Sequence, residues 1–190
     1  MAVTALPAQA ATIMVFGDSL SAAYGIAQQA AWPALLAERL QQQGLDYNVV
    51  NVSISGETSA GGRARLPAAL AKYQPNIVII ELGANDGLRG LPLTSLRDNL
   101  LAMIQSSKKT QAKVLLVGMR LPPNYGQYAQ RFAATFAEVA QAEKLAFMPF
   151  LLEGIAERPE LFQADGLHPV AAAQIQLLDK LWPKLRPLLK

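Results

Sequence analysis

The chain contains a single histidine, His168, and the residues around it suit acid–base chemistry near neutral pH. Of all side chains, histidine most often changes protonation near neutrality, so it is a common general base in enzymes. Asp165 precedes it by three residues, close enough on a tight turn to accept a hydrogen bond from the imidazole Nδ1. Pro169 disfavours helical geometry at His168 and is expected to begin the next helix, which leaves Nε2 as an acceptor. A lone histidine is more often structural, but this context favours a base with an orienting carboxylate.

A base of this kind needs a nucleophile, and the chain has no cysteine. Ser19 is the serine that directly follows the first β-rich run, after Gly17 and Asp18, and it precedes a loop of small residues. Most serines at such positions serve turns or helix caps. The nucleophile elbow G-x-S-x-G of α/β-hydrolases does not occur, and neither do the main nucleotide-binding fingerprints. Ser19 is therefore the candidate nucleophile of a different kind of site.

Two further loops offer hydrogen-bond donors for an oxyanion that develops during acyl transfer. Gly56 follows the second β-rich run and can present an unobstructed backbone N–H, and Asn85 follows the third with a side-chain amide. Each has an ordinary alternative role, in a simple turn or in an Asx-turn. The presence of suitable chemistry in all four loops favours one shared site over four independent turns.

These loops lie between β-rich runs and helical stretches that alternate along the chain. Strands are expected over residues 12–16, 46–52, 76–81, 113–117 and 145–148, and helices over 32–43, 62–73, 95–107, 127–143 and 169–181. Five βα units predict an α/β fold with a parallel sheet and helices on both faces. In such a sheet, ligands bind beyond the carboxyl ends of the strands, where the four loops are found.

Composition limits the other classes of function. The 190 residues are 52% hydrophobic and 16% charged, which argues against disorder, and their length fits one domain. The apolar runs are far shorter than a membrane-spanning helix requires. Without cysteine and with one histidine, sites built from several thiolates or imidazoles are excluded. The net charge is +3, and the nearest approach to a basic cluster is interpreted as a solvated helix face, not a nucleic-acid site: Lys180, Lys184, Arg186 and Lys190.

The first eleven residues differ from the rest and end in the small-residue pattern Ala8-Gln9-Ala10. This pattern resembles a signal-peptide cleavage site, although the basic and apolar regions of a full signal peptide are missing. Residues 1–11 are expected to be the remnant of a signal peptide or a disordered terminus, and residues 12–190 a single domain. The first interpretation predicts a periplasmic or secreted protein.

Four short blocks of the sequence resemble the signature blocks of the SGNH (GDSL-type) hydrolases. They are Gly17-Asp18-Ser19-Leu20, Gly56 in the second block, Gly83-x-Asn85-Asp86 and Asp165-x-x-His168. The resemblance implies a flavodoxin-like three-layer α/β/α fold whose five-stranded parallel sheet has the order 2-1-3-4-5. It also implies catalysis without a metal or another cofactor.

Carried over by matching motif, the resemblance implies a role for each candidate residue. Ser19 would be the nucleophile, and Asp165 and His168 would complete its catalytic triad. The backbone N–H groups of Ser19 and Gly56 and the side chain of Asn85 would form the oxyanion hole.

Longer segments, at residues 31–36, 51–58, 81–90 and 121–126, resemble the bacterial periplasmic thioesterase I/protease I/lysophospholipase branch of this family. The branch implies small-molecule acyl esters and thioesters as substrates, with lysophospholipids among them. Ala84 stands where that branch often has glycine. The loops at residues 88–92 and 121–125 are expected to wall an acyl groove, with four candidate substrate contacts: Asp18, Leu88, Pro122 and Tyr125.

Four carboxylates near the site, Asp18, Glu57, Glu81 and Asp86, are interpreted as residues that fix its loops. Two alternatives stay open beside the serine esterase. One is a carbohydrate O-acetylesterase, which would prefer acetyl over longer acyl groups. The other is a non-catalytic flavodoxin-like binding module, which would explain the fold but not the convergence of Ser19, Asn85 and His168. The sequence makes no prediction of oligomeric state.

Overall fold

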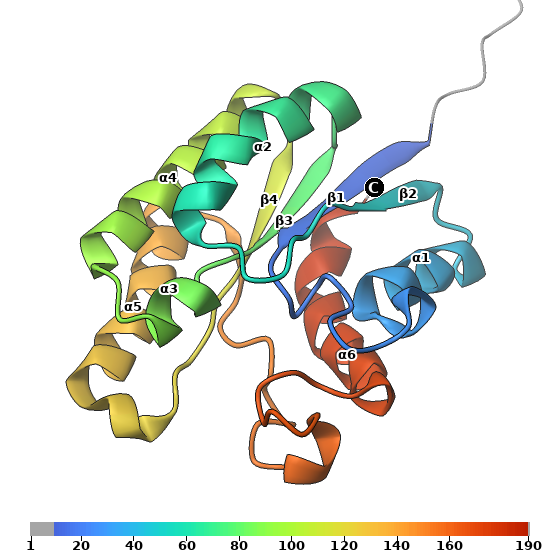
Figure 1. Cartoon of the computed structure of the whole chain (residues 1–190). Coiled ribbons are helices and arrows are strands. Elements are labelled where there is room, and N and C mark those ends of the chain that lie inside the picture. Colours follow the sequence, from blue (N-terminus) through green and yellow to red (C-terminus); the bar gives the residue numbers. More distant parts are fainter. Residues whose placement is uncertain (1–9, 190) are drawn as a thin grey trace, which may run out of the picture.

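The apolar runs of the sequence form the strands of one parallel sheet in the computed structural model, which describes residues 10–189 (Figure 1). The strand order is β2-β1-β3-β4-β5, as the family resemblance implied. The bounds are β1 Ala11–Gly17, β2 Tyr47–Asn51, β3 Ile77–Glu81, β4 Lys113–Val117 and β5 Ala146–Met148.

Helices cover both faces of this sheet and complete the three-layer α/β/α architecture (Figure 1). On one face, α1 (Trp32–Gln42) packs against α6 (Gln174–Leu185). On the other, α4 (Leu93–Lys109) packs between α2 (Ser59–Tyr73) and α5 (Gly126–Ala142). Among the described residues, no helix combines the length and the apolar character that crossing a membrane requires.

Burial of the central strands on both faces explains their unbroken apolar sequences. The side chains of Ile13 to Phe16 in β1 and of Val78 to Ile80 in β3 are completely buried. In α1, apolar side chains recur every four residues, at Trp32, Leu36 and Leu40, so one face of the helix is buried against the sheet. The unbroken apolar runs of the strands and the helical spacing of apolar residues in α1 are the reason the elements could be predicted.

Several boundaries differ from the sequence prediction. Helix α2 begins at Ser59 instead of residue 62, because the Thr58 hydroxyl caps it by accepting a hydrogen bond from the Gly61 N–H. The last helix begins at Gln174 and not at Pro169, because Pro169 forms a β-bridge with Phe162. A short helix, α3 (Ala84–Leu88), was not predicted.

The predicted amino-terminal segment, residues 1–11, lies almost entirely outside the described residues. Its last member, Ala11, belongs to β1 and pairs with Tyr47 of β2, so the sheet begins one residue earlier than expected.

The order of the strands determines where a ligand site can form. From β1 the chain passes to β2 on one side, and it then returns to β3 on the other side of β1. The loops that follow β1 and β3 therefore diverge and leave a crevice at the carboxyl ends of the strands. The first of these loops carries Ser19, and the second carries Asn85.

Candidate active site

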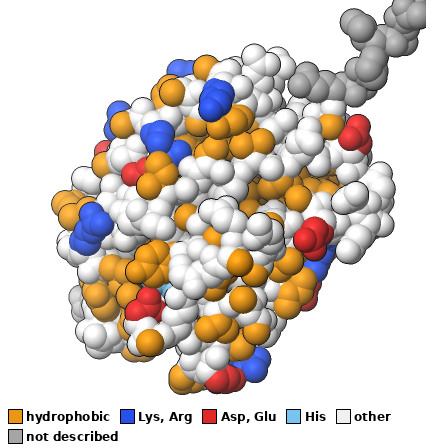
Figure 2. Space-filling view, turned by 45° about the vertical axis from the view of Figure 1, so that its right-hand side comes forward, with side chains coloured by type: hydrophobic (Ala, Val, Ile, Leu, Met, Phe, Trp, Pro, Cys, Tyr) orange, Lys and Arg blue, Asp and Glu red, His pale blue; other side chains and the backbone are white. Residues whose placement is uncertain are grey.

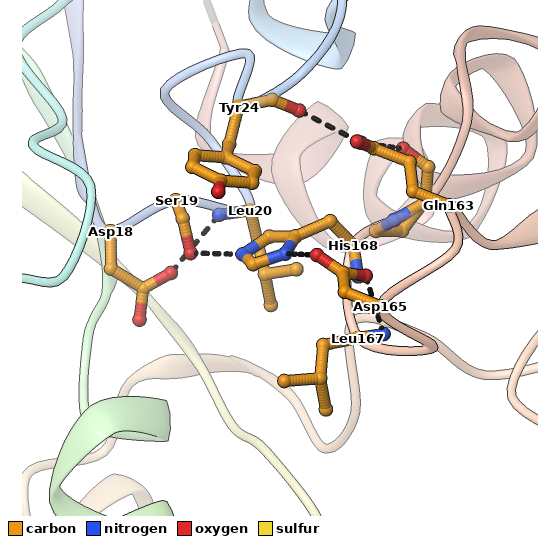
Figure 3. A network of polar contacts seen from close by, with 9 residues as sticks. Asp18, Ser19, Leu20, Tyr24, Gln163, Asp165, Leu167 and His168 are labelled. Atoms are coloured by element: carbon orange, nitrogen blue, oxygen red, sulfur yellow. Dashed lines mark hydrogen bonds and ion pairs between the residues drawn. The ribbon is translucent and has the colours of Figure 1, made fainter.

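Ser19, His168 and Asp165 form a continuous chain of hydrogen bonds at the carboxyl ends of the strands (Figure 3). His168 Nε2 lies 2.8 Å from Ser19 Oγ, and Nδ1 lies 2.6 Å from Asp165 Oδ2. An ionised carboxylate only accepts hydrogen bonds, so the neutral imidazole carries its proton on Nδ1. Nε2 is then the acceptor for the serine hydroxyl.

The turn that contains Asp165 orients the imidazole through short-range contacts. Asp165 Oδ1 accepts hydrogen bonds from the backbone N–H of Leu167 at 2.9 Å and of His168 at 3.0 Å. The His168 side chain, followed by these two N–H groups, lowers the pKa of Asp165 to about 2. The carboxylate is therefore ionised throughout the pH range in which histidine can serve as a base.

The three candidate oxyanion donors border the same pocket. Within residues 10–189, neither the Ser19 N–H nor the Gly56 N–H donates to another protein atom, so both are available to a ligand. The Asn85 amide donates to the carbonyl of Glu57 at 3.0 Å and to Asp18 Oδ2 at 3.3 Å. The longer contact, to Asp18, is the weaker of the two and the one that an incoming acceptor can replace.

Two arginines hold the loop that carries Gly56. Arg65 of α2 donates from Nε to Glu57 Oε2 at 3.0 Å and from Nη1 to the Val52 carbonyl at 2.8 Å. Arg89 donates to the carbonyl of Gly56 itself at 3.2 Å. Because the Glu57 carbonyl also accepts from the Asn85 amide, the same loop orients two of the three candidate donors.

Buried carboxyl groups lie directly beneath the loops of the site. Asp18 is completely buried and accepts a hydrogen bond from the Leu20 N–H at 3.1 Å. Glu81, at the end of β3, accepts one from the Ser21 hydroxyl at 2.6 Å. Asp86 accepts two from Ser59, one from its backbone N–H and one from its hydroxyl. These contacts agree with the interpretation of the carboxylates as loop-fixing residues.

Burial changes the protonation of two of these groups. Desolvation raises the pKa of Asp18 to about 6, against the opposing hydrogen bond from Leu20 and the charge of His168. Desolvation also raises the pKa of Glu81 well above its ordinary value, and the nearby Asp18 carboxylate raises it further. Both groups therefore hold their protons more tightly in the folded protein than in the unfolded chain.

A pocket of about 660 Å³ extends from Ser19 and His168 toward the carboxyl ends of β4 and β5. Of the predicted substrate contacts, Asp18, Leu88 and Pro122 line it. Tyr125 does not line the pocket, because its hydroxyl is turned toward the carbonyl of Leu88 at 3.4 Å. Asp18 is fully buried and hydrogen-bonded to Leu20 and Asn85, so it forms part of the floor of the pocket.

Sequence reasoning missed much of the apolar lining of this pocket. The missed side chains lie on several separate segments: Tyr24, Met119, Phe150, Leu152, Ala156, Phe162 and Leu167. Leu121, the first residue of a loop predicted as a groove wall, does line the pocket, and Leu167 lies between Asp165 and His168, so it could have been found from its neighbours. Phe150, Leu152 and Ala156 had no such signal. Residues 10–189 also contain no group of three or more His, Cys, Asp or Glu side chains arranged to hold a metal ion.

The raised pKa of Glu81 predicts a specific dependence of stability on pH. Since the folded state holds this proton above pH 4.5 and the unfolded chain releases it, stability falls as the pH rises from about 4.5. Glu81→Gln removes this titration and keeps an oxygen that can accept from Ser21. We expect the unfolding midpoint of this variant to fall less steeply with rising pH than that of the wild type. Asp18 leaves a residual slope that ends near pH 6.

Thermal unfolding at several pH values between 4 and 8 measures this slope. Glu38→Gln, on the exposed side of α1, removes a carboxylate without removing a buried one and is the matched control. Parallel curves for the wild type and Glu81→Gln would contradict the assignment.

Comparison with known proteins supports the resemblance seen in the sequence blocks. The model of the GDSL-like lipase/acylhydrolase family matches residues 15–174. Esterase TesA of Pseudomonas aeruginosa is 53% identical over 96% of this chain and 91% of its own length. Thioesterase 1/protease 1/lysophospholipase L1 of Escherichia coli is 42% identical over 95% of this chain and 86% of its own length.

A solved structure agrees with this relationship. The psychrotrophic esterase EstA from Pseudoalteromonas sp., in a structure inhibited by monoethylphosphonate, superposes with a TM-score of 0.89 at 39% identity. The match covers 93% of this chain and 97% of that one. The chain belongs to the GDSL-like lipase/acylhydrolase family and is a hydrolase of ester bonds.

Proposed function

We propose that the enzyme hydrolyses carboxylic acyl esters and thioesters through an acyl-enzyme formed on Ser19. His168 acts as the general base, and Asp165 orients it and stabilises its protonated form. The observation that carries the proposal is the chain of two hydrogen bonds from Ser19 Oγ through His168 to Asp165, at the mouth of an apolar pocket. Nucleophile, base and orienting group in this geometry are the parts that acyl transfer requires.

In the first half-reaction, Ser19 Oγ attacks the carbonyl carbon while His168 Nε2 takes the hydroxyl proton. The carbonyl oxygen becomes an oxyanion, which accepts hydrogen bonds from the N–H groups of Ser19 and Gly56 and from the Asn85 amide. The intermediate collapses when the bond to the leaving oxygen or sulfur breaks. His168 gives its proton to that atom, and the acyl group remains esterified to Ser19.

In the second half-reaction, a water molecule replaces the departed group. His168 takes a proton from this water, whose oxygen attacks the acyl carbon through a second oxyanion in the same site. The bond to Ser19 Oγ then breaks, and His168 returns the proton to the serine. The products are a carboxylic acid and an alcohol or thiol, and no cofactor enters the balance.

The Asn85 amide must exchange one hydrogen-bond partner during this reaction. Its nitrogen donates to two protein acceptors, the Glu57 carbonyl and Asp18. The Glu57 contact keeps the amide in place, and the 3.3 Å contact with Asp18 gives way to the oxyanion. Asp18 retains its hydrogen bond from the Leu20 N–H, so its carboxyl is not left without a donor.

The acyl chain is proposed to lie toward β4 and β5, where Met119, Phe150 and Leu152 line the pocket. Three large apolar side chains that line the pocket are also exposed to solvent, namely Tyr24, Leu88 and Leu167. An apolar groove with an apolar rim suits a substrate with a long acyl chain, such as an acyl thioester or a lysophospholipid. The Escherichia coli relative is named as a thioesterase and a lysophospholipase, and this name supports the same two substrate classes.

The two alternatives fit the molecule less well. An acetyl group would occupy a small part of a 660 Å³ apolar pocket, which disfavours a carbohydrate O-acetylesterase. A non-catalytic binding module disagrees with membership of a hydrolase family. On the face shown in Figure 2, Lys and Arg side chains are scattered and form no continuous groove for a polyanion.

Export to the periplasm is also part of the proposal. It is supported by the small-residue pattern Ala8-Gln9-Ala10, and the absence of cysteine is compatible with an oxidising compartment. The pattern lies outside the part of the chain that the structure describes, apart from Ala10.

Covalent labelling tests the nucleophile. A fluorophosphonate is expected to form one adduct on Ser19, found by peptide mass spectrometry in folded protein and lost after heat unfolding. Ser19→Ala and His168→Ala should abolish both the adduct and ester turnover, while Ser95→Ala, an exposed serine at the start of α4, should change neither. An adduct on Ser55, at the edge of the pocket, would overturn the assignment.

The role of Asn85 is tested by its removal. Asn85→Ala should lower kcat by roughly 10²–10³, the usual effect of losing an oxyanion donor, and should change KM little. Steady-state kinetics with a soluble aryl ester measures both constants. A loss of less than about tenfold would count against the assigned role.

The direction of the acyl chain is tested by filling the part of the pocket that the segment after β5 lines. Ala156 of that segment lines the pocket and is exposed, so Ala156→Trp should shift the preferred acyl length toward shorter chains and preserve turnover of short esters. The measurement is kcat/KM for a series of esters of increasing acyl length. Ala68→Trp, on the exposed side of α2, is the control. An unchanged length profile would place the chain elsewhere.

A further inference from the structure

The loop that carries Asp165 and His168 is joined to the loop that carries Ser19 through one glutamine side chain. Gln163 Nε2 donates to the carbonyl oxygen of Tyr24 at 2.8 Å and to that of Pro169 at 3.2 Å (Figure 3). Tyr24 lies in the β1–α1 loop, five residues after Ser19, and Pro169 directly follows His168. The amide therefore bridges the backbones beside both reacting residues.

The chemistry of this bridge requires a side chain with two N–H donors, which the uncharged amide of Gln163 supplies. Both partners are carbonyl oxygens, which only accept hydrogen bonds, so the side-chain group between them must supply two N–H donors. Within residues 10–189, the only other hydrogen bond between these two loops is the one from Ser19 to His168. Apart from the reacting pair itself, Gln163 thus forms the one direct hydrogen-bonded connection that the described residues show between the Ser19 loop and the His168 loop.

The β1–α1 loop is shaped to accept this side chain. Ala23 has a φ of 62° and Gly25 a φ of 70°, so both flank Tyr24 in left-handed conformations, which are costly for alanine. A Cβ on Gly25 would collide with the Gln163 side-chain oxygen. The local strain and the missing side chain together let the Tyr24 carbonyl reach the Gln163 amide.

The same contact places an aromatic ring against the base. The Tyr24 ring lies 4.3 Å from the His168 imidazole, centroid to centroid, at an interplanar angle of 35°. Figure 3 shows Tyr24 above the imidazole, on the side opposite Leu167. With its edge atoms bonded to Ser19 and Asp165 and its face against Tyr24, the imidazole has little freedom to turn.

The turn around His168 does not need the Gln163 side chain. The Gln163 backbone N–H donates to the His168 carbonyl at 2.8 Å, and the Gln163 carbonyl accepts from the Gly166 N–H at 2.9 Å. These backbone bonds, with the Asp165 contacts to Leu167 and His168, close the turn internally. Removal of the side chain amide therefore releases a formed turn from the Ser19 loop and does not unfold it.

We propose that Gln163 is a positioning residue that sets the distance between Ser19 and His168 by tethering the two loops through the Tyr24 and Pro169 carbonyls. This inference rests on the proposed roles of Ser19 and His168. Loss of the tether lowers the fraction of molecules with Ser19 Oγ and His168 Nε2 in contact, and catalysis is sensitive to displacements of about 1 Å. Acyl-chain binding, on the other side of the pocket, is unaffected.

The experiment uses Gln163→Met, which keeps the length of the side chain, and Gln163→Glu, which keeps its shape; neither supplies two donors. We expect kcat and the rate of fluorophosphonate labelling of Ser19 to fall together, by about 10- to 100-fold, with KM within about twofold of the wild type. Gln41→Met and Gln41→Glu, on the exposed side of α1, are the matched controls.

A second readout reports the geometry directly. His168 is the only histidine, so its ring protons give unique NMR signals, shifted upfield by the Tyr24 ring in the wild type. In the Gln163 variants these signals should move toward their unfolded positions while the unfolding midpoint stays close to that of the controls. This change separates loss of positioning from general destabilisation.

Three outcomes would overturn the proposal: unchanged kcat in both variants, an unchanged His168 signal, or a loss of activity that only follows a loss of folded protein. If the wild type itself fails to label at Ser19, the proposed catalytic function fails instead. Labelling of the wild type together with equal labelling of the variants contradicts the tether alone.

Discussion

The parallel pairing of β1 with β3 is the constraint on which the site depends. In this register Gly17 lies opposite Glu81, so the two strands end together and their following loops begin side by side. Ser19 lies two residues beyond the end of β1, and Asn85 lies four residues beyond the end of β3. A shift of one residue in this pairing would turn the buried side chains of the shifted strand to the opposite faces and disrupt their packing there, so the core itself maintains the relative height of the two loops.

Beneath these loops, the protein buries polar groups that oppose folding unless they are hydrogen-bonded. Glu81 occupies the space that a side chain on Gly17 would need, and it accepts from the Ser21 hydroxyl and the Asp18 N–H. Desolvation favours its protonated form, so the carboxyl binds these donors without a full buried charge at moderate pH. These hydrogen bonds support the Ser19 loop from below, and the burial of the carboxyl costs the folded protein some stability.

The candidate general base, His168, lies far from Ser19 in the sequence. His168 is 149 residues away from its Ser19 partner, on the loop between β5 and α6. This loop is stabilised internally by the Asp165 turn, but its position depends on contacts made across the pocket. In the part of the chain that the structure describes, the hydrogen bond from Gln163 to the Tyr24 carbonyl and the packing of the Tyr24 ring on His168 join this loop to the Ser19 loop beside the Ser19–His168 bond, which explains why small polar interactions at the rim matter to the chemistry.

Sequence by itself determined the fold class, the residue types of the site and the local turn that joins Asp165 to His168. These follow from strand-length apolar runs, from the helical spacing of apolar residues and from contacts three residues apart, which act over short distances along the chain. The four motif blocks likewise identified the family to which the chain belongs.

Only the tertiary structure decided which side chains meet across loops. Tyr125 was expected in the pocket, but the packing of its loop turns it toward the Leu88 carbonyl. Pro169 was expected to begin a helix, but its carbonyl accepts from Gln163 and its backbone pairs with Phe162. Contacts of this kind depend on the relative placement of segments far apart in sequence, and no local propensity encodes that placement.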